Sequence, residues 1–291
     1  MENLAETSTL RKIDLNKFLF ELNDSCLDTR SKPWTDCFSA IPQDPYIKEG
    51  YRFKQIAWFR VKHRDAAAVN GIDAHLQMIN EDSGMDPATS ARLLSTGIPA
   101  WEKKDYQVWE LPQYAMQQSS KYNPVHGDIP RQYESIPSGL KSSEDIQSLL
   151  IGYAEKFALT DAIILMQFQR VLCSADQEGH PAVEGFHQDG NLHVAMLIAN
   201  RINIKSSTGV SQYTRDENGK CGKELVFNSA LQPGELVYWN DKKLWHFGTP
   251  IEIADPAANG GLGYRDIVLM SAKTPPQHLP LGPVPERLRN W

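Results

Sequence analysis

The chain has 291 residues, of which 41% are hydrophobic and 23% are charged, and its formal net charge is -6. These values are typical of a folded globular protein and argue against a disordered, collagen-like or coiled-coil chain. No Lys/Arg-rich segment is dense enough for a nucleic-acid surface, and no eighteen apolar residues run together, so we expect neither a nucleic-acid nor a membrane partner. No signal-peptide pattern is present, so we expect a cytoplasmic location. The oligomeric state stays open.

The four cysteines lie far apart in the sequence. Cys26, Cys37, Cys173 and Cys221 form no Cys-x-x-Cys pair. Because zinc knuckles and disulfide frameworks need closer or paired spacings, we expect four reduced, structural thiols.

The N-terminal half predicts mainly helices. Apolar residues recur near helical spacing at 15–26 and 65–84, and 85–141 has a mixed pattern of short helices and turns. The segment 50–61 is rich in aromatic and β-branched residues, which favours a strand. The clearest helix is 142–159, where Ser142 or Ser143 can cap the first turn.

From residue 162 onward the pattern changes to short strands separated by turn signals such as Asn218-Gly219. The expected strands are 162–173, 192–203, 223–231, 234–240, 244–253 and 264–273. We therefore predict an α+β fold: a double-stranded β-helix (jelly-roll, cupin-like) barrel core with a helix-rich N-terminal half packed on it.

The expected domain organisation is one domain over 1–291. Its parts are a mixed, substrate-side part at 1–160, the barrel core at 161–273 and a proline-rich tail at 274–291, which holds five prolines. No Gly/Ser/Pro-rich linker separates the first two parts.

A candidate metal site lies in the strand-rich half. The stretch "GFHQDGNLH" (185–193) places His187 two residues before Asp189, and His246 follows in "KLWHFGTP". Two imidazoles and one carboxylate occupy one face of an octahedral Fe(II) and leave the other positions open. The alternatives are a turn with a half-exposed histidine, or a zinc site that uses His193; a core role for His193 is favoured over that site.

Arg265, in "YRDIVLM", is a candidate anion-binding residue. On a strand after the last histidine its guanidinium can hold a carboxylate through two parallel hydrogen bonds. Alternation along the strand would place Ile267 and Leu269 on the same face. The alternative is a buried salt bridge, with Asp266 as a partner.

The order of these motifs resembles that of the 2-oxoglutarate- and Fe(II)-dependent dioxygenases. More narrowly, it is similar to the branch that contains bacterial L-isoleucine 4-hydroxylase and other hydroxylases of free amino acids, through Gln169 in "FQRVLC" and through "DIPRQYESI" (128–136). The resemblance covers residues 120–273; the first third of the chain matches loosely, and the loop "DPAANGGLG" (255–263) is an addition.

The resemblance implies a function. His187, Asp189 and His246 would bind Fe(II), and Arg265 would bind the distal carboxylate of 2-oxoglutarate, with O2 as second co-substrate and ascorbate helpful in vitro. Gln169 has two readings, a co-substrate contact or an ordinary strand residue. No catalytic residue beyond the iron ligands is implied. The expected reaction is hydroxylation of a free L-amino acid, with conversion of 2-oxoglutarate to succinate and CO2.

Substrate recognition is expected from the N-terminal half. A free amino acid needs a cation for its carboxylate, an acceptor for its ammonium group and a side-chain pocket. The candidate contacts are Arg52, Arg131, Asp128 and Tyr133.

Three other functions stay open at this point. The same chemistry could act on a carrier-bound amino acid, a peptide or a small natural product. A non-catalytic metal- or ligand-binding barrel belongs to another class. A zinc hydrolase would need a positioned general base, and no residue is nominated for that role.

Overall fold

The structure is a computed structural model that describes residues 19–47, 50–64, 98–103, 105–123 and 127–272. The strands are β1 (Phe20–Asp24), β2 (Arg52–His63), β3 (Ile98–Lys103), β4 (Tyr106–Glu110), β5 (Glu134–Ser135), β6 (Asp161–Ser174), β7 (His193–Ile202), β8 (Ser211–Asp216), β9 (Cys221–Ser229), β10 (Glu235–Asn240), β11 (Leu244–Gly248) and β12 (Leu262–Ala272). The helices are α1 (Lys32–Ser39), α4 (Ser138–Lys141), α5 (Glu144–Lys156) and the 3-10 turn η2 (Asn259–Gly261).

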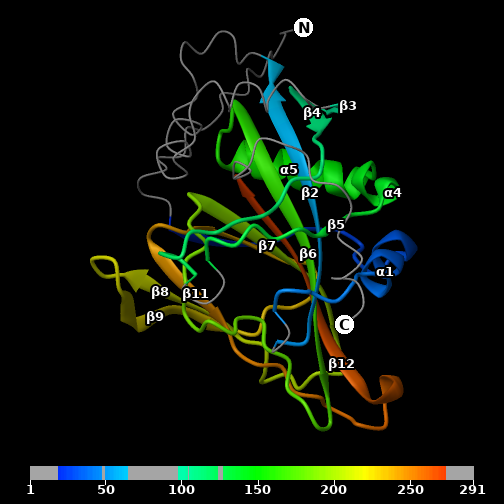
Figure 1. Cartoon of the computed structure of the whole chain (residues 1–291), viewed down its shortest axis with the longest axis vertical. Helices are drawn as coiled ribbons and strands as arrows, with labels where there is room; N and C mark the ends of the chain where they lie inside the picture. Colours follow the sequence, from blue (N-terminus) through cyan, green and yellow to red (C-terminus); the bar gives the residue numbers. More distant parts are fainter. Residues whose placement is uncertain (1–18, 48–49, 65–97, 104, 124–126, 273–291) are drawn as a thin grey trace, which may run out of the picture.

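These strands form two sheets. The large sheet has the order β1-β10-β7-β12-β6-β2-β4-β3, and β5 pairs with β2; the small sheet has the order β11-β8-β9. Every pairing is antiparallel except that of β5 with β2. In Figure 1 the small sheet lies on the left and helices α1 and α4 on the right, with the long strands of the large sheet between them.

The two faces of the large sheet bury different partners, because successive side chains of a strand point to opposite faces. On one face, Phe59 of β2, Met166 of β6 and Val268 of β12 join a core cluster with the apolar side of α5. Ser143 caps α5 by accepting a hydrogen bond from the Ile146 N–H. The helices therefore cover the face that lies away from the predicted metal ligands.

The opposite face of the large sheet packs on the small sheet and on a long connection. Met196 and Trp239 pack there against Tyr213 of β8. Trp58 precedes Phe59 in β2 and therefore points to this opposite face, where it packs against the segment 111–133. The space left between these two covers is the pocket described below.

Several predicted elements are confirmed. The strand at 50–61 corresponds to β2, the helix at 142–159 to α5, and the six C-terminal strands to β6, β7, β9, β10, β11 and β12. The four cysteines are free. The tail at 274–291 and the helix predicted at 65–84 lie outside the described residues.

The helix predicted at 15–26 is wrong where the structure describes it. Residues 20–24 form β1, which pairs with β10 at the edge of the large sheet. Phe20 places its ring 5.1 Å from that of Tyr213 and 4.8 Å from that of Phe227. These contacts with distant segments outweigh the weak helical pattern of the short segment.

The N-terminal half also supplies strands to the sheet of the C-terminal half. Within the described part of residues 1–160, five strands accompany α1, α4 and α5, so a helix-rich half is not shown. β2 pairs with β6 from Arg52↔Val171 to Lys62↔Asp161. In the described ranges no helix is long and apolar enough to cross a membrane.

Candidate metal centre and pocket

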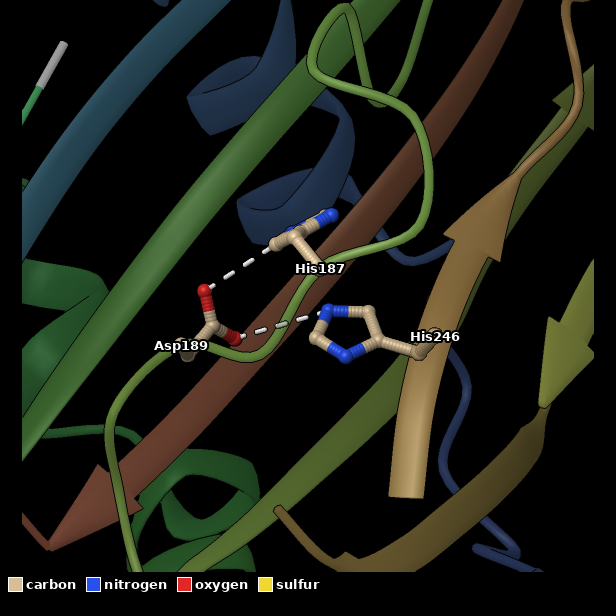
Figure 2. A group of neighbouring side chains, drawn as sticks. All are labelled: His187, Asp189 and His246. Atoms are coloured by element: carbon tan, nitrogen blue, oxygen red, sulfur yellow. Dashed lines mark ion pairs between the residues drawn. The ribbon is translucent and has the colours of Figure 1, made fainter. Parts of the chain in front are cut away.

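The three predicted metal ligands come from two segments that an isolated β-bridge between His187 and His246 joins. His187 and Asp189 lie in the loop between β6 and β7, and His246 lies in β11. The backbones of His187 and His246 exchange two hydrogen bonds, of 3.0 and 2.9 Å. Figure 2 shows that the three side chains point toward one another.

Their donor atoms converge without bonding to each other. One ligand atom of each residue lies within 4.8 Å of the other two. Asp189 Oδ1 is 3.9 Å from His187 Nε2, and Asp189 Oδ2 is 3.6 Å from His246 Nε2. Both distances exceed hydrogen-bond length, so the Asp189 carboxylate lies between the two imidazoles without bonding to either of them. This spacing leaves room for an ion between the three side chains. This donor set fits Fe(II).

The loop backbone accommodates this arrangement through two glycines. Gly185 and Gly190 have φ values of +77° and +75°, which L side chains rarely adopt. A Cβ on Gly190 would also lie 2.5 Å from the ring of Tyr122. The loop can therefore turn sharply on both sides of the His187-Asp189 pair, as the glycines of the motif indicate.

Different contacts prepare the two histidines for metal binding. Nδ1 of His187 lies 2.9 Å from the Gly185 carbonyl oxygen, so this nitrogen carries the proton and Nε2 is left as the ligand atom. Burial, together with the charge of His187, lowers the pKa of His246 to about 3. His246 is therefore neutral at physiological pH, as coordination requires.

A buried carboxylate, Asp241, lies next to the metal centre. It is fully buried, and it accepts hydrogen bonds from the backbone N–H groups of Asp189 (3.1 Å) and Asn191 (3.0 Å). Its Oδ1 also lies 3.7 Å from His246 Nδ1. Burial and the charge of Asp189 raise the pKa of Asp241 to about 7. One side chain thus fixes the backbone of the Asp189 arm and lies beside the imidazole of His246.

Replacing Asp241 by Asn should weaken both the fold and metal binding. The amide offers one acceptor oxygen to N–H groups that now use two, so the free energy of unfolding should fall by about 1–3 kcal/mol. Loss of an outer partner should lower metal affinity roughly 10- to 100-fold. Calorimetric unfolding and metal titration measure the two effects. The exposed Asp176→Asn is the matched control, and equal behaviour of both variants would contradict the role of Asp241.

Arg265 lies in the same pocket without an acidic partner among the described residues. It is 3% exposed, its Nη2 donates to Ser211 Oγ at 3.1 Å, and its Nε has no hydrogen-bond partner. Burial, reinforced by Arg201, lowers the pKa of Arg265 to about 10. Asp266 points to the other face, where it accepts from Arg170 at 2.7 and 2.8 Å. The salt bridge considered from the sequence therefore does not form.

Strand register arranges the floor of the pocket in rows. Arg52, Val171 and Arg265 form one row across β2, β6 and β12, and Lys54, Gln169 and Ile267 form the next. The pocket encloses about 810 Å³ of empty volume, part of it open solvent. Its apolar lining comprises Ile47, Met116, Met196, Phe247, Ile267 and Leu269. A polar and an apolar part thus lie side by side.

The remaining candidate residues differ in their positions. Arg52, Arg131 and Gln169 line the pocket, and Arg52 donates to Gln169 Oε1 at 3.3 Å. Asp128 is exposed and accepts from the Ser120 N–H, away from the pocket lining. Tyr133 is buried outside the lining, and its hydroxyl donates to Asp44 at 3.3 Å.

His193 belongs to the other side of the large sheet. It is fully buried and its ring stacks on that of Phe157 at 4.2 Å. The metal-ligand group found among the described residues consists of His187, Asp189 and His246 alone. A zinc site built with His193 is therefore not formed.

Four pocket-related residues were missed in the sequence. They are Lys54, Gln118, Glu184 and Asp241. Lys54 follows Arg52 by two residues in a predicted strand, so alternation could have placed it on the same face. Gln118, which donates to Asp189 Oδ1 at 2.8 Å, stands in no recognisable pattern.

Comparison with known proteins agrees with this geometry. The profile of the family described as 2OG-Fe dioxygenase matches residues 73–271. A comparison with proteins of curated function found no match.

Two solved structures share the fold. A bsmA homolog from Methylobium petroleophilum PM1 is 19% identical with a TM-score of 0.64, over 89% of this chain and 90% of its own. The Fe(II)/(alpha)ketoglutarate-dependent dioxygenase TqaL is 11% identical with a TM-score of 0.53, over 89% of this chain and 83% of its own. Since the family profile spans more than half of the chain, including the three candidate metal ligands, the chain belongs to the 2OG-Fe dioxygenase family.

Proposed function

We propose that this protein hydroxylates an unactivated C–H bond of a free L-amino acid. Family membership provides the cofactors, which are Fe(II), 2-oxoglutarate and O2. When bound by His187, Asp189 and His246, Fe(II) would supply the oxidation chemistry, in which O2 is consumed and 2-oxoglutarate is converted to succinate and CO2. The amino-acid substrate is our extension, and the sequence motifs shared with the L-isoleucine 4-hydroxylase branch support it.

The side chains of the pocket have separate tasks in this proposal. His187, Asp189 and His246 hold the iron, and Asp241 fixes the backbone of Asp189 by accepting a hydrogen bond from its N–H group. Arg265 receives the distal carboxylate of 2-oxoglutarate, since its buried guanidinium lacks an acidic partner in the described chain. The apolar wall formed by Ile267 and Leu269 keeps water away from this ion pair.

One observation carries the amino-acid proposal: the metal ligands share a pocket with apolar side chains and with cations other than Arg265. An apolar wall fits an aliphatic side chain, and the further cations fit an α-carboxylate. Glu184 lines the same pocket and has a buried carboxylate oxygen without a hydrogen-bond partner among the described residues, as an ammonium group requires.

The finer fold expectation belongs to this proposal too. A double-stranded β-helix has two facing antiparallel sheets, and the packing of β8 and β11 against the large sheet supports that description. A carrier-bound amino acid, a peptide or a small natural product is the nearest alternative substrate.

An aerobic assay tests the function. The protein is incubated with Fe(II), ascorbate, 2-oxoglutarate and pooled L-amino acids, and succinate and a product heavier by one oxygen atom are measured by mass spectrometry. We expect stoichiometric formation of both with at least one amino acid. Turnover of a peptide or carrier substrate alone would overturn the amino-acid proposal. Metal binding without succinate from any substrate would favour a non-catalytic barrel.

A further inference from the structure

Three basic side chains gather in the pocket on the side of β2. Arg52 and Lys54 project from β2, and Arg131 comes from the segment that covers this strand. We call them the cation cluster. Each is at most 7% exposed. Bringing three cations together away from water is costly unless anions compensate them.

Lys54 is the most poorly compensated member of the cluster. The ammonium group is 3.4 Å from Met116 Sδ, a weak acceptor, and it lies 4.8 Å from the centre of the Tyr133 ring. Burial, with the charges of Arg131 and Arg52, lowers the pKa of Lys54 well below its usual range, and the more distant carboxylates of Asp44 and Asp189 offset this only in part. No carboxylate of the described residues lies within ion-pair distance of this ammonium group, which leaves it without a partner of its own.

Arg131 is compensated only in part. Its Nη2 donates to Gln118 Oε1 at 2.8 Å, while its Nε is buried without a hydrogen-bond partner among the described residues. Gln118 in turn donates to the metal ligand Asp189. Arg131 therefore presents an unused donor beside the iron site.

Asp44 and one carboxylate oxygen of Glu184 already have other partners. Asp44 accepts hydrogen bonds from the N–H groups of Tyr46 (2.9 Å) and Ile47 (3.2 Å), and from Tyr133 Oη. Glu184 interacts with Arg52 and lies 3.6 Å from His187 Nε2. Arg52 also donates to the Pro181 carbonyl at 3.1 Å. Arg52 thus has partners for its charge and its hydrogen-bond donors, whereas the positive charges of Lys54 and Arg131 have no acidic partner among the described residues.

The cation cluster is separate from Arg265. Strand β6 lies between β2 and β12, so two strand spacings, about 10 Å, separate the backbones of Arg52 and Lys54 from that of Arg265. The titratable neighbours that act on Arg265 are Arg201 and Tyr213, whereas those that act on Lys54 are Arg131, Arg52, Asp44 and Asp189. The pocket therefore contains two places for anions.

We propose that Lys54 and Arg131 form a second anion subsite, which binds a carboxylate of the substrate while 2-oxoglutarate occupies the side of Arg265. The inference rests on the proposed function and names the substrate class: a carboxylic acid whose acid group is unmodified. Amides and esters of the same molecule would leave the two cations buried and unpaired, and would bind poorly.

A binding experiment without turnover tests the subsite. The holoenzyme with Fe(II) and 2-oxoglutarate is titrated anaerobically, in a calorimeter, with L-amino acids, N-acyl amino acids and dipeptides, and with the carboxamide of each. We expect at least one acid to bind roughly 10- to 100-fold more tightly than its amide. In Lys54→Met and Arg131→Met this preference should shrink toward unity.

The preference ratio separates the subsite from other effects. If Arg131 acts only through Gln118 and Asp189, its variant weakens acid and amide equally and the ratio persists, which overturns the proposal. The ratio should be unchanged in the exposed controls Lys32→Met and Arg215→Met. If only an N-acyl amino acid or a dipeptide shows the ratio, the subsite holds and the free-amino-acid function fails. If no acid binds the wild type, the subsite is wrong.

Thermal unfolding gives a second readout. Replacing a lysine that stabilises the fold lowers the stability of the protein, whereas replacing an uncompensated buried cation does not. The unfolding midpoint of the ligand-free Lys54→Met protein should therefore equal or exceed that of the wild type, by up to about 4 °C. A midpoint lowered by several degrees would contradict the proposal. Added ligand should stabilise the wild type more than the variant.

Discussion

Substituting His187 by Ala should weaken metal binding by more than about 100-fold and abolish iron-dependent turnover. Loss of an outer partner of a metal ligand typically costs 10- to 100-fold in affinity, so loss of the ligand itself costs more. His187 also anchors the loop through backbone hydrogen bonds to His246, which alanine retains. The affinity for Fe(II) or Co(II) can be measured by anaerobic titration, and turnover from succinate.

The control for this substitution is His180→Ala. His180 is partly exposed, lies 4.0 Å from Glu178 and does not line the pocket. The His180→Ala variant should bind metal and form succinate like the wild type. Wild-type metal affinity in His187→Ala would show that the ligand assignment is wrong.

Replacing Arg265 by Gln should raise the KM for 2-oxoglutarate by at least about 30-fold. A buried carboxylate that loses its cationic partner typically costs 2–5 kcal/mol of binding. Metal affinity should change little, because the described residues that interact with Arg265 are Ser211, by a hydrogen bond, and Tyr213 and Arg201, through their charges, and none of these is a metal ligand. The dependence of succinate formation on 2-oxoglutarate concentration measures the effect.

Two further variants sharpen this prediction. Arg265→Lys keeps the charge but loses the planar pair of donors, so its KM should lie between those of the wild type and Arg265→Gln. The exposed Arg215→Gln should behave like the wild type. A KM for 2-oxoglutarate that is unchanged in Arg265→Gln would place the co-substrate elsewhere, and the cation cluster would then be the next location to test.

The metal ligands and the long strands could be predicted from the sequence because their signals are local. The His187-Asp189 pair, the glycines beside it and the strand around His246 can each be recognised within about ten residues. The strands β6 and β12 likewise follow from apolar runs rich in strand-forming residues between turn signals. Arg265 could be found because its strand is strongly apolar and a lone cation stands out in it.

The supporting residues depend on long-range packing and could not be predicted. Asp241 stands in a turn signal, and only the fold brings its carboxylate to the N–H groups of Asp189 and Asn191. The β1 segment has a helical pattern that pairing with β10 overrides. Lys54 lies between these cases, since alternation along β2 could have indicated its face but not its lack of an acidic partner.

The shared rows of β2, β6 and β12 have a consequence for how this pocket can change. Backbone hydrogen bonds set the separation between the backbones of Lys54 and Arg265, so side-chain substitutions leave it constant. The described parts of the connection between β4 and β5, residues 111–123 and 127–133, belong to none of the named strands, and they carry Met116, Gln118 and Arg131 into the pocket. Altering that connection would move Arg131 and so retune substrate choice, while the backbones of Lys54 and Arg265 stay in place.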